Sequence, residues 1–157
     1  MLDPKLANWI WEVIKVGLLE DDIEKAKAMI AALYDRGLEL PSQIETMLLE
    51  IWSSGDESAL WDLALLSAEK AFFDVRESVL LIALLVCKGK LGIKTAFGLL
   101  GFVGFNLNEL DPSIRHVIDV VWLLRHDSEA GVMEAEDDTL LAEALERVLN
   151  EYRTKDR

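Results

Sequence analysis

The side chains that most often perform catalysis or bind metals are few and scattered in this sequence. It contains two histidines, His116 and His126, and one cysteine, Cys87, with no HExxH or CxxC pattern. A structural zinc site needs four ligands, chiefly nitrogen and sulfur, so these residues do not predict one. Cys87 ends an apolar run, 84–87, where we expect a buried thiol with a raised pKa and therefore a poor nucleophile.

An acidic segment offers the only alternative for metal chemistry. This segment contains four acidic residues, Glu134, Glu136, Asp137 and Asp138. Their carboxylates supply the oxygen ligands that Mg²⁺ prefers. Acidic side chains also stabilise a helix N-terminus, which explains the group more simply. The segment 92–95 lacks the glycine spacing and preceding strand of a phosphate-binding loop. We therefore predict no cofactor, no metal and no enzymatic activity, with an enzyme carrying an acidic divalent-metal site as an alternative.

The strongest candidate for a functional surface lies on a helix predicted from about residue 111 to residue 126. At about 100° per residue, one side of this helix carries Arg115, Asp119, Trp122 and His126. Arg115 and Asp119 have the i,i+4 spacing of an ion pair. The opposite side is apolar and should face the core, and it comprises Ile114, Val117, Ile118, Val121 and Leu124. Trp122 is therefore either covered by another helix or by the acidic loop that follows, or exposed as a binding hot spot.

Four other tryptophans need a place in the fold. Trp9 and Trp11 lie about 160° apart on the first predicted helix, so one core contact cannot bury both. Either this helix is packed from two sides, or one of them contacts a partner or a second copy of the chain, and Trp11 is our candidate. Trp52 and Trp61 flank a turn at 53–58 and are expected in the core.

Glycines recur every three residues at Gly98, Gly101 and Gly104. Glycine costs about 1 kcal/mol relative to alanine inside a helix, so three of them in one helix need a structural reason. We predict that they let another helix approach closely, and the alternative is a ligand against that face.

Capping signals mark the helix boundaries along the chain. Asp3-Pro4 and Asp111-Pro112 each place an N-cap before a proline, and Asp74 with Glu77 has capping-box spacing. The signals predict eight helices and no confident strand, with the helices at about 4–20, 22–36, 42–52, 57–73, 75–88, 93–105, 112–126 and 138–152. The polar tail, 153–157, is expected to fray.

These elements predict an all-α fold in a single domain, 1–157. Val75-Arg76 and Ile114-Arg115 begin two similar helices 39 residues apart. Here the sequence resembles HEAT-type helical repeats, with Asp74–Arg76 and Asp111–Arg115 matching the opening of that family's second helix. The resemblance implies a stacked array whose concave face binds other proteins. We favour a compact orthogonal bundle, because the apolar segment 78–105 is typical of a central hairpin.

The same hairpin could in principle enter a membrane. Its apolar runs, 78–87 and 95–105, reach about half of the 20 or so residues that a spanning helix needs, and Lys88, Lys90 and Lys94 separate them. We therefore predict no stable membrane insertion. A single cysteine and the lack of a signal-peptide pattern favour a cytoplasmic location.

The charge of the chain narrows the choice of partner. The net charge is −13, from 29 acidic and 16 basic residues, which disfavours direct binding to nucleic-acid phosphates. We predict a non-catalytic protein–protein interaction module, an adaptor or regulatory subunit, whose partner has a basic surface. A homodimer in which two copies of the chain exchange their last helix is an alternative. An alternative of another class is a small acidic inhibitor or nucleic-acid mimic that occupies a basic protein site.

Overall fold

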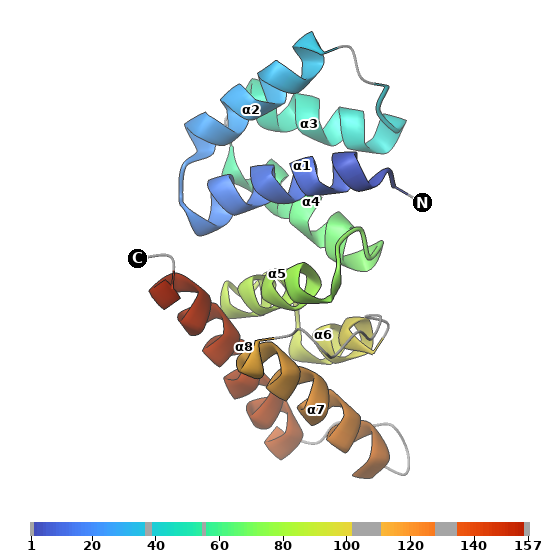
Figure 1. Cartoon of the computed structure of the whole chain (residues 1–157), viewed down its shortest axis with the longest axis vertical. Helices are drawn as coiled ribbons and strands as arrows, with labels where there is room; N and C mark the ends of the chain where they lie inside the picture. Colours follow the sequence, from blue (N-terminus) through green and yellow to red (C-terminus); the bar gives the residue numbers. More distant parts are fainter. Residues whose placement is uncertain (1, 37–38, 55, 102–110, 128–134, 156–157) are drawn as a thin grey trace. The chain divides into compact units, whose positions relative to one another are not determined.

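The structure is a computed structural model that describes residues 2–36, 39–54, 56–101, 111–127 and 135–155 (Figure 1). Within these ranges it contains helices and no strand, which confirms the predicted all-α class. The length of the chain predicts a single domain. In the structure the helices pack as two compact units, Met1–Phe72 and Phe73–Arg157. Each unit is described by itself.

The first unit is built from four α-helices and one π-helical segment. In chain order these are α1 (Pro4–Ile14), η1 (Lys15–Leu19), α2 (Ile23–Asp35), α3 (Ser42–Ser54) and α4 (Glu57–Glu69). The helix η1 packs against α2 and α4, and α3 packs against both α2 and α4. The expected helix over residues 4–20 is present, but its last five residues are π-helical. The fourth helix ends at Glu69, earlier than expected, and Ala71 follows with a φ of 52°.

A close approach at Gly17 determines how η1 packs. Gly17 is buried, and a Cβ at this position would collide with a side-chain methyl group of Leu60 in α4. Leu60 is fully buried, so its side chain has little room to move aside. Glycine at position 17 is therefore required for η1 to lie this close to α4.

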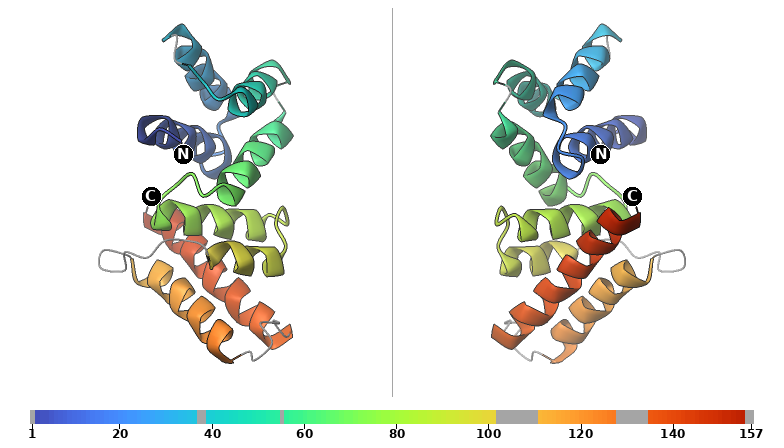
Figure 2. Two further views of the ribbon diagram at one scale, coloured as in Figure 1. Left: turned by 90° about the vertical axis from the view of Figure 1, so that its right-hand side faces the viewer. Right: turned by 90° about the vertical axis from the view of Figure 1, so that its left-hand side faces the viewer.

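The second unit is arranged around its last helix. It contains α5 (Val75–Cys87), α6 (Ile93–Leu100), α7 (Pro112–Asp127) and α8 (Ala135–Lys155). Helix α8 contacts α5, α6 and α7, and Figure 2 shows it in red beside α7 in orange and crossing α5 in green. The expected central hairpin is therefore only partly correct. All residues of α5 from Ser78 to Leu85 are buried, whereas in α6 only Ala96 and Leu100 are.

The helix ends follow the capping signals closely. The Asp3 carboxylate accepts a hydrogen bond from the backbone N–H of Lys5 at 2.8 Å, and the Asp74 carboxylate accepts one from Glu77 at 2.9 Å. At the other end of the chain α8 continues to Lys155, and the fraying of residues from 153 onward stays a prediction. Residues 102–105 of the expected sixth helix and the tail 156–157 lie outside the described ranges.

Two glycine substitutions should change stability in opposite directions. Gly17→Ala should lower the free energy of unfolding by about 1–3 kcal/mol, because the new methyl group must displace the buried Leu60 side chain. Gly98→Ala should raise it by up to about 1 kcal/mol, because a Cβ there meets nothing within 4 Å and alanine favours the helix. Urea denaturation followed by circular dichroism measures both. Equal effects of the two substitutions would contradict this account of Gly17.

Candidate functional site

Helix α7 presents the predicted stripe to solvent. Its four side chains, Arg115, Asp119, Trp122 and His126, are all exposed, and Trp122 keeps 51% of its surface accessible. The five residues predicted for the core face are buried, namely Ile114, Val117, Ile118, Val121 and Leu124. The helix therefore has a complete core contact without Trp122. The acidic loop considered as a cover for Trp122 lies outside the described residues.

The ion pair predicted within the stripe is not formed. In the described part of the chain the ion pairs join Arg76 to Asp111 at 3.4 Å and Arg147 to Glu151 at 3.3 Å. Arg115 and Asp119 are both exposed to solvent, which screens the attraction between their charges. Because this weak attraction must offset the entropy lost when two side chains are ordered, an exposed pair of this kind gains little by forming. The Arg76–Asp111 pair instead joins the start of α5 to the residue before α7.

Trp122 stands at the edge of a pocket near the end of α7. The pocket has a volume of about 280 Å³ and is lined by Gly101, Val121, Trp122, Arg125 and His126. The rings of Trp122 and His126, one helical turn apart, have centroids 5.1 Å apart and planes inclined by 35°. This ring contact restricts the orientation of the indole, although half of its surface is in solvent.

Arg125, which lies outside the predicted stripe, supplies the positive charge of this pocket. Its guanidinium carbon lies 5.6 Å from the centre of the Phe97 ring, in cation–π geometry. The guanidinium also lies directly against Gly101, where a Cβ would occupy the same space. Among the described residues no carboxylate is within ion-pair distance of Arg125. Sequence periodicity could not find this residue, because its surroundings come from α6.

The three regularly spaced glycines have different surroundings. Gly101 admits the Arg125 side chain, whereas Gly98 has no neighbour within 4 Å of a built Cβ. The predicted close helix packing is therefore wrong at Gly98, which faces open space. At Gly101 the approaching group is a side chain and not a backbone. Gly104 lies outside the described residues.

The burial of the remaining tryptophans differs from the prediction. Trp11 is only 7% exposed and Trp9 is partly buried, so their helix is packed from more than one side. Trp11 is therefore unavailable to a partner in this fold, and we withdraw it as a contact residue. Trp61 is buried as expected, but Trp52 is 52% exposed. The core-facing residues of α3 are Ile44, Leu48 and Ile51, and Trp52 lies about 100° from the last of them.

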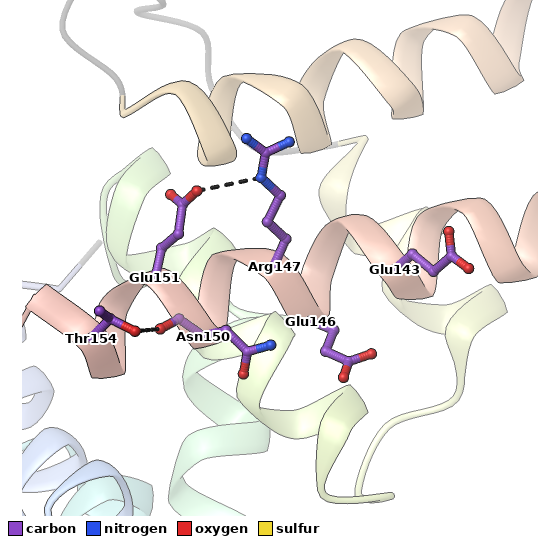
Figure 3. A pocket seen from close by; sticks show the side chains of 6 residues that line it. All are labelled: Glu143, Glu146, Arg147, Asn150, Glu151 and Thr154. Atoms are coloured by element: carbon purple, nitrogen blue, oxygen red, sulfur yellow. Dashed lines mark hydrogen bonds and ion pairs between the residues drawn. The ribbon is translucent and has the colours of Figure 1, made fainter.

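A larger pocket follows the outer face of α8 (Figure 3). It measures about 510 Å³ and is lined by Glu143, Glu146, Arg147, Asn150, Glu151 and Thr154. Arg147 donates a hydrogen bond to the Glu151 carboxylate at 3.3 Å, and the Thr154 hydroxyl donates one to the Asn150 carbonyl at 2.8 Å. Because all six residues come from one helix, this pocket is an acidic helix face with one of its carboxylates already paired.

Residues 2–36, 39–54, 56–101, 111–127 and 135–155 contain no group of three or more His, Cys, Asp or Glu side chains placed to hold a metal ion. Of the acidic group considered for magnesium, Glu134 lies outside these ranges. Glu136, Asp137 and Asp138 lie in the first turn of α8, where carboxylates favour the helix N-terminus. None of the helices in the same ranges combines the length and apolar character needed to cross a bilayer.

Cys87 is exposed, so the prediction of a buried thiol is wrong. It is the last residue of α5, beyond the run of buried residues that ends at Leu85. Partial desolvation nevertheless raises the pKa of the thiol, and the Glu146 carboxylate raises it further, against smaller opposing effects of Arg153 and Lys88. The thiol is therefore accessible but weakly nucleophilic at neutral pH.

Comparisons of this chain with protein-family models, curated proteins and solved structures found no match. The resemblance to HEAT-type repeats therefore rests on the two helix openings alone.

The exposure of Trp122 can be tested against a buried residue of the same helix. Trp122→Ala should change the free energy of unfolding by no more than about 0.5 kcal/mol, as for ordinary surface positions. Leu124→Ala should lower it by about 2–5 kcal/mol, because Leu124 is only 5% exposed and its loss leaves a cavity. Urea denaturation measures both variants. A loss at Trp122 comparable to that at Leu124 would mean that the indole belongs to the core.

The raised pKa of Cys87 predicts its reactivity. The rate of alkylation by iodoacetamide should reach half of its maximum at a higher pH than for N-acetylcysteine amide, because only the thiolate reacts and its formation is disfavoured. Glu146→Gln should shift this midpoint downward, since it removes a negative charge that opposes ionisation. A midpoint at or below that of N-acetylcysteine amide would contradict the assignment.

Proposed function

We propose that this chain is a non-catalytic protein–protein interaction module and that its partner contacts the surface centred on Trp122 of α7. The observation that carries the proposal is a half-exposed indole, held against His126 at the edge of a pocket, on a helix whose core face is complete. A large exposed aromatic ring that the fold does not need is the kind of side chain that dominates protein interfaces.

The neighbouring side chains support an interface at this place. Leu123 is 52% exposed and follows Trp122 directly, so two large apolar side chains reach solvent within one turn. Arg125 and His126 border the same pocket and supply polar groups around the apolar centre. An apolar centre with polar surroundings is the usual composition of a protein interface.

A second candidate function is an acidic inhibitor that occupies a basic site on another protein. The exposed face of α8 favours it, with Glu143, Glu146 and Glu151 against Arg147, and so does the net charge of −13. Binding through this face should weaken strongly with added salt, whereas binding through Trp122 should depend on salt only moderately. We further propose a cytoplasmic location, which an exposed free thiol at Cys87 supports.

Affinity capture with matched baits tests the leading proposal. The wild-type chain should recover a partner from an extract of its source cells, and Trp122→Ala should reduce recovery at least about 30-fold, as for loss of a hot spot. Trp52→Ala is the matched control, because it removes an equally exposed indole from the other unit, 52% against 51%. Quantitative mass spectrometry compares the three baits.

The capture result separates the candidates. Equal losses with Trp122→Ala and Trp52→Ala would show general stickiness of exposed indoles and would remove the support for α7. A partner that Trp122→Ala retains and that 0.5 M salt releases would favour the acidic face of α8.

A further inference from the structure

We propose that the pocket lined by Gly101, Val121, Trp122, Arg125 and His126 binds an acidic side chain of the partner that stands next to an aromatic residue. The carboxylate would contact Arg125 and His126, and the aromatic ring would pack on the exposed indole of Trp122. This inference rests on the proposed function, because it names the chemistry of the partner segment that reaches α7.

The state of Arg125 is the first argument. Its guanidinium lines the pocket, and no carboxylate of the described residues is within ion-pair distance. A guanidinium can donate two parallel hydrogen bonds to one carboxylate, the strongest common pairing for this group. A carboxylate, which has two oxygens, is therefore the group that best complements the Arg125 guanidinium.

The second argument is that the guanidinium is already positioned. It lies over the Phe97 ring and against Gly101, where no side chain other than hydrogen would fit. An arginine held in this way loses less side-chain freedom on binding than one extended into solvent. The contact with Phe97 and Gly101 also joins α7 to α6, so Arg125 has a structural part as well.

The size and walls of the pocket select a short peptide segment. A volume of about 280 Å³ lies just below the range of about 300–1,000 Å³ that drug-sized ligands occupy, so it holds one or two side chains. Val121 and the Trp122 ring provide apolar walls, and the His126 ring provides a second polar group beside Arg125. An acidic residue next to an aromatic one matches this combination.

Helix α7 is less acidic than the chain as a whole. It contains two arginines and two aspartates, which balance, whereas the chain has a net charge of −13. The outer face of α8 is acidic, with three glutamates and one arginine. Long-range repulsion from the whole chain falls off within about 8 Å at 0.15 M ionic strength, so binding is best measured there.

A titration of the full ¹⁵N-labelled chain tests the proposal without a known partner. The chain has five tryptophans and hence five indole N–H signals, and Trp122→Phe identifies the signal of Trp122. The probes are the blocked dipeptides acetyl-aspartyl-phenylalanine amide and acetyl-asparaginyl-phenylalanine amide, which differ in charge and hardly in shape. Both are added at millimolar concentrations.

We expect the aspartyl dipeptide to shift the Trp122 signal in a saturable way and to leave the Trp52 signal unchanged. The asparaginyl dipeptide should bind at least about tenfold more weakly, as expected for loss of a charge-assisted hydrogen bond. Arg125→Gln should weaken binding of the aspartyl dipeptide by a similar factor. Arg36→Gln is the matched control, because Arg36 is an exposed arginine of the first unit that does not line the pocket, and this variant should bind as wild type.

Equal binding of the two dipeptides would show that the pocket recognises apolar groups only and would overturn the proposal. So would a Trp122 signal that neither dipeptide moves, or an Arg125→Gln variant that binds as wild type. If Arg125→Gln does not fold, the comparison of the two dipeptides on the wild-type chain still decides. If the dipeptide titration fails but capture still depends on Trp122, the proposal of a protein interaction module stands and only the acidic ligand is excluded. If capture does not depend on Trp122 but the titration succeeds, the interaction module loses its support and the ligand chemistry of the pocket stands.

Discussion

The second unit depends on the burial of one apolar helix face, that of α8. This face contacts α5, α6 and α7, and its residues Leu141, Leu145 and Val148 are almost fully enclosed. Helix α8, with 21 residues, is longer than each of its three neighbours, which have 13, 8 and 16 residues. The other helices are therefore arranged around it, and α6 and α7 each keep exposed residues whose composition the core does not constrain.

The candidate site follows from this arrangement. The core face of α7 is used in packing within the unit, so the side of α7 with Trp122, Leu123 and His126 is left in solvent. At the end of the same helix Arg125 reaches the last turn of α6, where Phe97 and Gly101 receive it. Cations are also favoured at helix C-termini, so the location suits the charge on two grounds.

Charge is divided between two surfaces of this unit. The outer face of α8 holds carboxylates of which only Glu151 has an ion pair in the described structure, with Arg147. The pocket at α7 holds the Arg125 guanidinium, which forms no ion pair with another residue that the structure describes. A strongly acidic chain is usually described by its net charge, yet recognition depends on local charge within a Debye length. The two surfaces therefore fit chemically different groups on a partner.

The sequence by itself determined the helices and their inward faces. Asp3 and Asp74 mark helix starts through local hydrogen bonding, and the period of apolar residues in α7 identifies its buried side, because both signals act within a few residues. Tertiary structure decided everything that depends on a neighbour distant in sequence. Trp11 is enclosed and Trp52 is not, Gly98 faces space while Gly101 admits Arg125, and Cys87 lies just beyond the core. No periodicity within one helix contains that information, since each outcome depends on which other helix covers a given face and how far it reaches.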